Sequence, residues 1–119
     1  MLLPNEADLR VYLHRAPIDM RKQRNGLAAL VREVVKQDPF STALYCFIGK
    51  RRDKLKILYW HKNGFVVWYK VVEGKERFHW PRGDEAVVTL TREQLLWLLD
   101  GYDVWKMKPH QVLHFSHVS

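Results

Sequence analysis

A run of basic side chains in the middle of the chain is the feature with the clearest chemical meaning. Lysine and arginine bind phosphate oxygens, and each phosphate that they neutralise releases a counterion. Such a run is therefore typical of a surface that binds the backbone of a nucleic acid without identifying its base sequence. We predict that the following residues contact DNA phosphates, with an ordinary solvated turn as the alternative: Lys50, Arg51, Arg52, Lys54, Lys56, Lys62 and Lys70.

Aromatic residues alternate with these cations between positions 59 and 69. Rings on a basic surface can stack on unpaired bases. Rings at alternating positions of a central hairpin usually pack into the core, however, and we expect most of these to be buried. The exception that we expect to contact nucleic acid is Trp60, because Lys56 and Lys62 lie on the same face of the predicted hairpin.

A second basic group, Arg21, Lys22 and Arg24, lies at the start of a predicted helix. Free backbone amides and the helix dipole attract anions at a helix N-terminus, so these residues would extend the nucleic-acid surface. Alternatively, Asp19 caps the helix and forms an ion pair with Arg21. The sequence leaves both interpretations open.

Two patterns of catalytic residues occur in weak form. Asp53 and the Glu-Gly-Lys motif at 73–75 have the loose order of acids and lysine found in metal-dependent nucleases, but the glycine favours a turn. His110, His114 and His117 would suit zinc, but no cysteine or acidic fourth ligand accompanies them at a strong spacing. We therefore predict no catalytic residue, no metal, no cofactor and no enzymatic activity, with a metal-dependent nuclease as an alternative.

The charge of the chain is unevenly distributed. The 119 residues carry a net charge of +7. Residues 50–82 contain ten basic and three acidic side chains, whereas the remainder is balanced at ten and ten. The excess therefore belongs to one structural unit, for which a polyanion is the natural partner.

Length and cysteine content indicate the class of protein. A chain of 119 residues that is 47% apolar suits one folded domain, and we predict a core at about 9–101 and a C-terminal tail at 102–119. The single cysteine, Cys46, stands in an apolar run and indicates a reducing compartment. No secretory signal and no stretch of about 20 apolar residues occurs, so we expect a cytoplasmic protein without a membrane partner.

Apolar periodicity predicts two helices. Residues 24–36 have apolar side chains at helical spacing, and the proline that follows ends this helix. Residues 91–100 begin with a capping box formed by Thr91 and Gln94, and Gly101 suits the left-handed residue that closes a helix. Runs of β-forming residues predict the remaining elements as strands, the last two less regular than the others: 9–14, 43–49, 54–61, 65–72, 77–80 and 86–90.

The dipeptide Asn63-Gly64 predicts a two-residue hairpin turn between the two longest strands. That turn would pair Trp60 with Val67, and Lys56 with Val71. Both faces of this hairpin are largely apolar, so both must be at least partly covered. We predict a single α+β domain with a mostly antiparallel meander of about five strands and two main helices packed on one face.

Eight short stretches, in order across about residues 9–101, resemble a known family. They are VYL at 11–13, PIDMRK at 17–22, GLAALV at 26–31, QDPFS at 37–41, KILYW at 56–60, GF at 64–65, WYK at 68–70 and FHWP at 78–81. Their order and spacing are similar to those of the accessory proteins, often named TnpB, encoded by the second reading frame of insertion sequences of the IS sixty-six family. The RNA-guided nuclease that shares this name is unrelated.

The resemblance implies a factor that assists a separate transposase and has no assigned catalytic residue. Together with the basic hairpin, it leads us to predict a non-catalytic accessory factor for DNA transposition whose partners are DNA and the transposase of the same element. The alternative is a protein-interaction adaptor, whose basic patch binds an acidic surface of the transposase and does not contact DNA.

Overall fold

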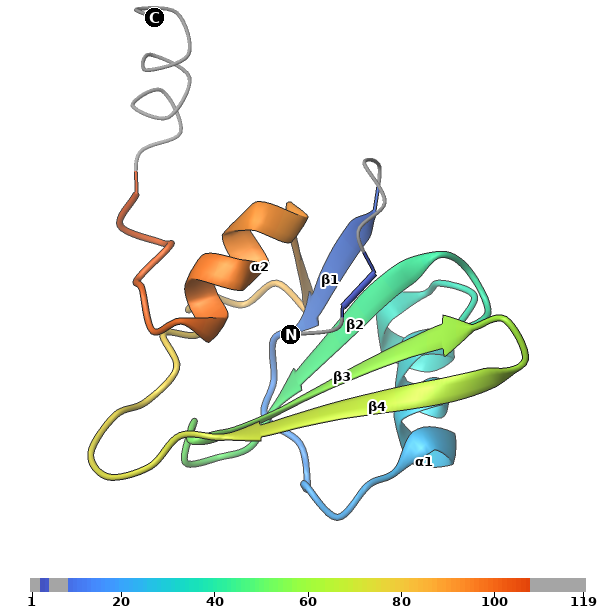
Figure 1. The fold of residues 1–119 in the computed structure, drawn as a ribbon, viewed down its shortest axis with the longest axis horizontal. Coiled ribbons are helices and arrows are strands. Elements are labelled where there is room, and N and C mark those ends of the chain that lie inside the picture. Colours follow the sequence, from blue (N-terminus) through green and yellow to red (C-terminus); the bar gives the residue numbers. More distant parts are fainter. Residues whose placement is uncertain (1–2, 5–8, 108–119) are drawn as a thin grey trace, which may run out of the picture.

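A five-stranded sheet forms the centre of the structure, a computed structural model that describes residues 3–4 and 9–107 (Figure 1). The strands are β1 (Arg10–His14), β2 (Ala43–Ile48), β3 (Lys54–His61), β4 (Gly64–Val71) and β5 (Val87–Leu90). The helices are α1 (Arg24–Leu30), which continues into the π-helical turn η1 (Val31–Val35), and α2 (Arg92–Leu99). Both predicted helices are confirmed, whereas the predicted strand at 77–80 is wrong, because these residues form a loop.

The order of the strands in the sheet is β4-β3-β2-β1-β5. β1 pairs with β2 in parallel, and all other neighbours are antiparallel. Two parallel strands cannot be joined by a tight turn, so the chain crosses over through α1 between them. The predicted α+β class and mostly antiparallel sheet are confirmed, but the sheet is not a simple meander, because β1 lies between β2 and β5.

Burial on both faces defines the central strand β2, in which every residue is buried. Because side chains alternate along a strand, Leu44, Cys46 and Ile48 belong to the core on one face, and Tyr45 and Phe47 to the core on the other. The neighbouring strands β1 and β3 divide their apolar side chains in the same way. The sheet therefore needs a cover on each side.

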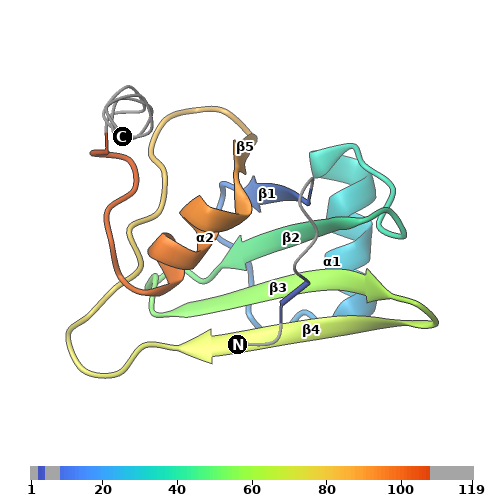
Figure 2. The ribbon, with the colours of Figure 1, turned by 45° about the horizontal axis from the view of Figure 1, so that its top comes forward.

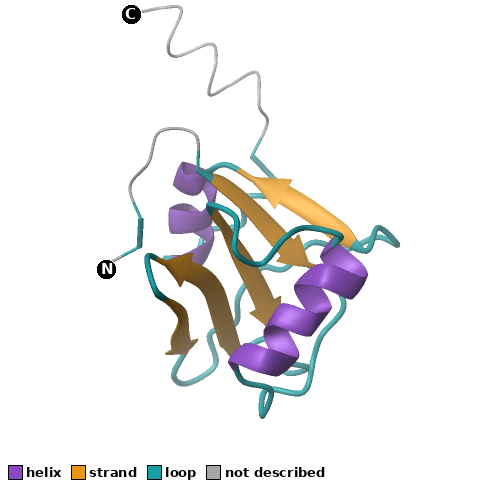
Figure 3. Ribbon diagram, turned by 90° about the vertical axis from the view of Figure 1, so that its right-hand side faces the viewer, coloured by secondary structure: helices purple, strands orange, loops and turns teal. Residues whose placement is uncertain are grey.

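The two helices provide these covers from opposite faces (Figures 2 and 3). Leu27 and Val31 of the α1–η1 segment pack in the core that contains Phe47. Leu95 and Leu98 of α2 pack in the core that contains the other face of β2. The prediction that both helices lie on one face is therefore wrong. The physical reason is that the central strands are apolar on both sides, so one face could not be left in water.

The hairpin between β3 and β4 is confirmed, but its register is not. His61 pairs with Gly64 and Trp60 with Phe65, so the turn residues are Lys62 and Asn63. Lys62 has a φ of 53°, and Gly64 belongs to the strand. Each cross-strand partner therefore lies two residues from its predicted position. A shift of two preserves the alternation of side chains, so the predicted faces of the hairpin are unchanged.

The capping box of α2 forms as predicted. Gln94 N donates to Thr91 Oγ1 at 3.1 Å, and Thr91 N donates to Gln94 Oε1 at 2.9 Å. Beyond the other end, Gly101 has a φ of 100°, a conformation that glycine adopts without steric cost. α2 therefore starts and stops where local chemistry dictates, and the chain after it turns back toward the loop that follows β4.

Opposite burial of the helices leads to a first prediction. Leu27 and Leu98 are both fully buried, so we expect Leu27→Ala and Leu98→Ala each to lower the free energy of unfolding by about 2–5 kcal/mol. Urea denaturation followed by circular dichroism measures this change. Val71→Ala serves as the control, because Val71 is 39% exposed and its truncation should cost less than about 0.5 kcal/mol. A small effect at either leucine would contradict packing of that helix on the sheet.

The single cysteine provides a second prediction. Cys46 is fully buried in β2, and this burial raises the pKa of its thiol. Because the thiolate is the reactive form, we expect the folded protein to react very slowly with a disulfide reagent such as dithionitrobenzoate. In urea, one thiol per chain should react, with a midpoint equal to that of unfolding. Rapid reaction in the absence of denaturant would contradict the buried position.

Candidate nucleic-acid interface

The turn between β2 and β3 presents Lys50, Arg51 and Arg52, three of the predicted phosphate-binding residues. Arg52 N donates to Gly49 O at 3.0 Å, and Arg52 itself has a φ of 60°. Lys50 and Arg51 are exposed, whereas Arg52 is half-buried. The turn is thus a tight connection at the end of two central strands, and its hydrogen bond fixes the backbone that carries these cations.

The loop from β4 to β5 returns past this turn (Figure 1). Phe78 N donates to Arg52 O at 2.8 Å, and the indole Nε1 of Trp80 donates to Arg15 O at 2.9 Å. Both aromatic rings are buried in the core on the α2 side of the sheet. These two anchors fix the loop, and its exposed residues Arg77 and Arg82 lie on either side of them in the sequence.

A third segment, after α2, completes the same region. Val104 is buried in the core on the α2 side. Trp105 Nε1 donates to His79 O at 2.5 Å, so this segment is attached directly to the loop from β4 to β5. Asp103 accepts a hydrogen bond from the backbone N of Trp105 at 3.2 Å. The beginning of the predicted tail is therefore anchored, and residues 108–119 lie outside the described residues.

These three segments line an open cleft of about 890 Å³. Its lining is rich in basic and aromatic side chains and has one carboxylate: Lys50, Arg51, Arg52, Arg77, Phe78, His79, Trp80, Pro81, Arg82, Asp103, Trp105 and Lys106. We call this hollow the basic cleft. Six cations converge here from three parts of the chain, and a concave surface lined by one sign of charge concentrates the electrostatic field.

The carboxylate in the basic cleft neutralises little of this charge. Asp103 lies 3.6 Å from Nδ1 of His79 and 3.9 Å from Nζ of Lys106. Within the described part of the chain, Lys50, Arg51 and Arg82 form no ion pair with a carboxylate. The contacts of Asp103 with His79 and Lys106 are long and partly exposed, so each contributes less than about 1 kcal/mol. Most of the cleft's cations are therefore available to an anionic ligand.

Two of the cleft's arginines differ in their hydrogen bonding. Arg77 Nη1 donates to the carbonyl oxygens of Gly74 and Glu76, at 3.1 and 2.6 Å, so part of its guanidinium is already occupied. Nε of Arg52 is the one buried side-chain nitrogen or oxygen in the described residues that has no hydrogen-bond partner. A buried donor without a partner costs about 1–3 kcal/mol, and a phosphate oxygen that accepted a hydrogen bond from this Nε would remove that cost.

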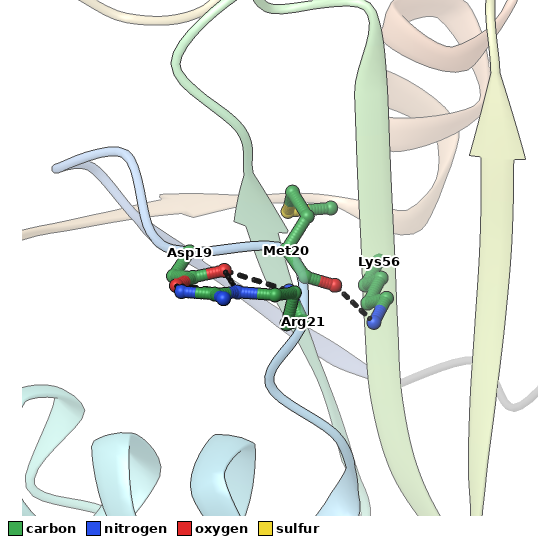
Figure 4. Close-up of polar contacts among 4 residues, drawn as sticks. All are labelled: Asp19, Met20, Arg21 and Lys56. Carbon is green, nitrogen blue, oxygen red and sulfur yellow. Dashed lines mark hydrogen bonds and ion pairs between the residues drawn. The ribbon is translucent and has the colours of Figure 1, made fainter.

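Two of the lysines predicted to contact phosphates, Lys56 and Lys70, donate hydrogen bonds to backbone oxygens. Lys56 Nζ donates to Met20 O at 2.7 Å (Figure 4). It also donates to Lys22 O at 2.8 Å, and the two bonds fix the segment before α1. Lys70 Nζ donates to Leu99 O at 2.7 Å, at the C-terminal end of α2. The two lysines lie on opposite faces of the sheet. Lys70 is paired with Leu55 and shares its face, whereas Lys56, the next residue after Leu55 in β3, points to the other face. Neither lysine lines the basic cleft, although Lys70 lines a neighbouring hollow that shares Arg77 and Phe78 with it.

Lys62 and Trp60 lie at the other end of the hairpin. β3 has eight residues, which at about 3.3 Å per residue separates its two ends by roughly 25 Å. Lys62 is exposed in the turn. Trp60 packs edge-on against Phe40 and Phe65, with ring centroids 4.9 and 5.0 Å apart. These predicted contacts are therefore distant from the three at the turn between β2 and β3.

The remaining predicted residues surround the segment before α1. Lys54 lines a shallow hollow of about 350 Å³ that shares Lys50 and Arg51 with the basic cleft. Arg21 forms an exposed ion pair with Asp19 at 2.6 Å (Figure 4). This pair was predicted as the alternative to a nucleic-acid contact by Arg21. This contact holds the pKa of Asp19 below its usual range. Lys22 and Arg24 are exposed.

Asp19 does not cap α1. The residue before the helix is Gln23, and no side chain caps it. Asp19 instead accepts hydrogen bonds from the backbone N and the guanidinium of Arg21. The cap prediction is wrong because helix α1 starts at Arg24, five residues after Asp19, too far for a capping hydrogen bond.

Three of the six cations of the basic cleft were not predicted from the sequence. Arg77 and Arg82 fall in the basic region 50–82 but were not assigned to the site, and Lys106 and Trp105 were placed in a tail without a role. A signal for the loop existed in the FHWP motif at 78–81, since its buried Phe78 and Trp80 fix the flanking arginines. The position of Lys106 had no local signal.

The catalytic alternatives gain no organised site. Asp53 is half-buried beside the start of β3, and Glu73 is exposed. Across residues 3–4 and 9–107, no group of three or more His, Cys, Asp or Glu side chains is placed to hold a metal ion. His110, His114 and His117 lie outside the described residues.

No helix among residues 3–4 and 9–107 has the length and apolarity needed to cross a membrane.

Comparison with known proteins identifies the family. Residues 9–109 match the family described as IS66 Orf2 like protein. The chain is 30% identical over 100 residues to the uncharacterized protein y4jC of Sinorhizobium fredii, covering 84% of this chain and 85% of that protein. It is 30% identical over 105 residues to the uncharacterized protein y4hO of the same organism, covering 88% of this chain and 90% of that protein. No solved structure matches the chain. It therefore belongs to the IS66 Orf2 like proteins, a family of transposition-associated accessory proteins of insertion sequences.

Proposed function

We propose that this protein assists transposition by binding the phosphate backbone of DNA in the basic cleft. The observation that carries the proposal is that six cations line a single hollow in which only one carboxylate, Asp103, opposes them. A DNA backbone is the polyanion that an accessory protein of an insertion sequence meets, and phosphate contacts supply most of the affinity of such complexes. The residues proposed to make these contacts are Lys50, Arg51, Arg52, Arg77, Arg82 and Lys106.

Rigidity of the basic cleft supports this function. The turn carrying Lys50–Arg52 and the loop carrying Arg77 are connected by the hydrogen bond from Phe78 N to Arg52 O. Buried rings anchor the loop from below. A backbone that is fixed before binding loses little further conformational entropy when phosphates arrive, so the cations that it carries bind more tightly than the same residues on a mobile segment.

A second candidate function is contact with the transposase, and one observation favours it. Phe40 is 53% exposed although its ring packs on Trp60 and Phe65, so an aromatic cluster faces solvent at the hairpin end of the sheet. Exposed apolar clusters often mark protein-binding surfaces. The aromatic cluster and the basic cleft lie at opposite ends of β3, so one molecule could bind DNA and the transposase at the same time.

Charge reversal tests the basic cleft. We expect Arg51→Glu combined with Arg77→Glu to weaken binding to a fluorescent 20-base-pair duplex by at least tenfold, measured by anisotropy at low salt. For the unmodified protein, the logarithm of the association constant should fall by about 0.9 per logarithmic unit of salt for each phosphate contacted. The reversal should reduce this slope, because fewer phosphates are neutralised.

The matched control for this test is Lys62→Glu combined with Arg32→Glu, which changes the net charge equally at exposed positions remote from the cleft. We expect its affinity for DNA to stay within about twofold of the unmodified protein. Equal losses in both double variants would show that binding depends on total charge and not on the cleft. No DNA affinity together with intact capture of the transposase would favour the adaptor alternative.

The aromatic cluster has its own test. We expect Phe40→Asp to weaken capture of the purified transposase of the same element by at least fivefold in a pull-down, because a carboxylate replaces the exposed ring. Its affinity for DNA should be unchanged, since Phe40 does not line the basic cleft. Undiminished capture by the variant would argue against a contact through this cluster.

A further inference from the structure

We propose that the basic cleft binds single-stranded DNA, with unpaired bases stacked on the rings of Trp105 and His79 and phosphates held by the surrounding arginines. This inference rests on the proposed function, that the cleft binds DNA, and specifies the form of DNA that it prefers. It follows from the presence of aromatic rings and cations in the same hollow.

The aromatic part of the basic cleft has two layers. Phe78 and Trp80 are only 3% and 5% exposed, so they support the site from within the core. Trp105 is half-buried, and the side chain of His79 is 49% exposed, so these two rings are accessible to a ligand. Flat accessible rings beside cations are the surface on which proteins stack the bases of a single strand.

Trp105 is held in a fixed orientation. Its indole N–H is already donated to His79 O, its backbone N is bonded to Asp103, and the adjacent Val104 is buried. Tryptophan has no other hydrogen-bond donor in its side chain, so the ring can contact a ligand only through its faces and edges. A ring that is already ordered loses little entropy on stacking, which favours a base as its partner.

The shape and volume of the basic cleft also favour a single strand. A duplex presents phosphates outside and keeps its bases stacked on one another, so it could reach the cations but not cover the rings. In a single strand, successive bases can turn into a hollow while the backbone follows the rim. The cleft's volume of about 890 Å³ lies within the range of roughly 300–1,000 Å³ typical of sites that enclose a small organic ligand, which leaves room for a nucleotide base and its sugar.

The experiment compares a 20-nucleotide oligo(dT) with a 20-base-pair duplex, both by fluorescence anisotropy at the same salt concentration. We expect the single strand to bind at least tenfold more tightly, although the duplex carries more charge. Trp105→Ala should weaken binding of the single strand by about 5- to 160-fold, the range found for loss of one stacking ring. The same variant should change binding of the duplex by less than about twofold.

Trp97→Ala is the matched control, because Trp97 is also half-buried against the core on the α2 side but does not line the basic cleft. Both affinities should be unchanged in this variant. Trp105→Phe retains a flat ring, so it should keep the single-strand affinity within about threefold and also serves if Trp105→Ala does not fold. Oligo(dT) should quench the tryptophan fluorescence of the unmodified protein more than that of Trp105→Phe.

Two outcomes distinguish failure of this inference from failure of the proposed function. If the duplex binds as tightly as the single strand and Trp105→Ala weakens neither selectively, the cleft binds only backbone, and the preference for single strands is wrong. If neither DNA binds and the cleft variants have no effect, the proposed function itself is wrong.

Discussion

Burial of β2 on both faces is the constraint on which the rest of the structure depends. A strand whose residues alternate between two apolar cores can be stable only when each face of the sheet has its own cover. α1, which joins the parallel pair β1 and β2, covers one face, and α2 covers the other. Both faces of the central strands are covered by helices, and the basic cleft is built from a turn and loops beyond the ends of the strands.

The basic cleft illustrates how a binding site is formed at such an end. Its cations come from a turn, a long loop and the segment after α2, and each piece is anchored to the core on the α2 side by an aromatic or aliphatic side chain. The hydrogen bonds between Phe78 and Arg52, and between Trp105 and His79, connect the three pieces. Charge and position are therefore supplied by different residues, with the core responsible for position.

Local chemistry was sufficient to predict most elements of this fold. The capping box at Thr91, the alternation along 54–61 and the hairpin itself depend on neighbours in sequence. The faces of the helices and the parallel pairing of β1 were not predictable, because an apolar run does not say which partner covers it. The register of the β3–β4 hairpin differs from the prediction by two residues because the residue with left-handed backbone geometry is Lys62, and not Asn63 or Gly64. Cations at 50–52 were identified by their density, whereas Lys106 has no such signal.

Assembly of the basic cleft from segments about 30 and 50 residues apart has a consequence for how it forms. Bringing distant segments together requires closure of long loops, whose entropic cost must be met before any contact between them is gained. The cleft should thus appear late, after the sheet has organised and α2 has docked. An excised β2–β4 peptide would keep the densest cluster of positive charge yet lack the cavity, so charge content and ligand selectivity are separable properties of this chain.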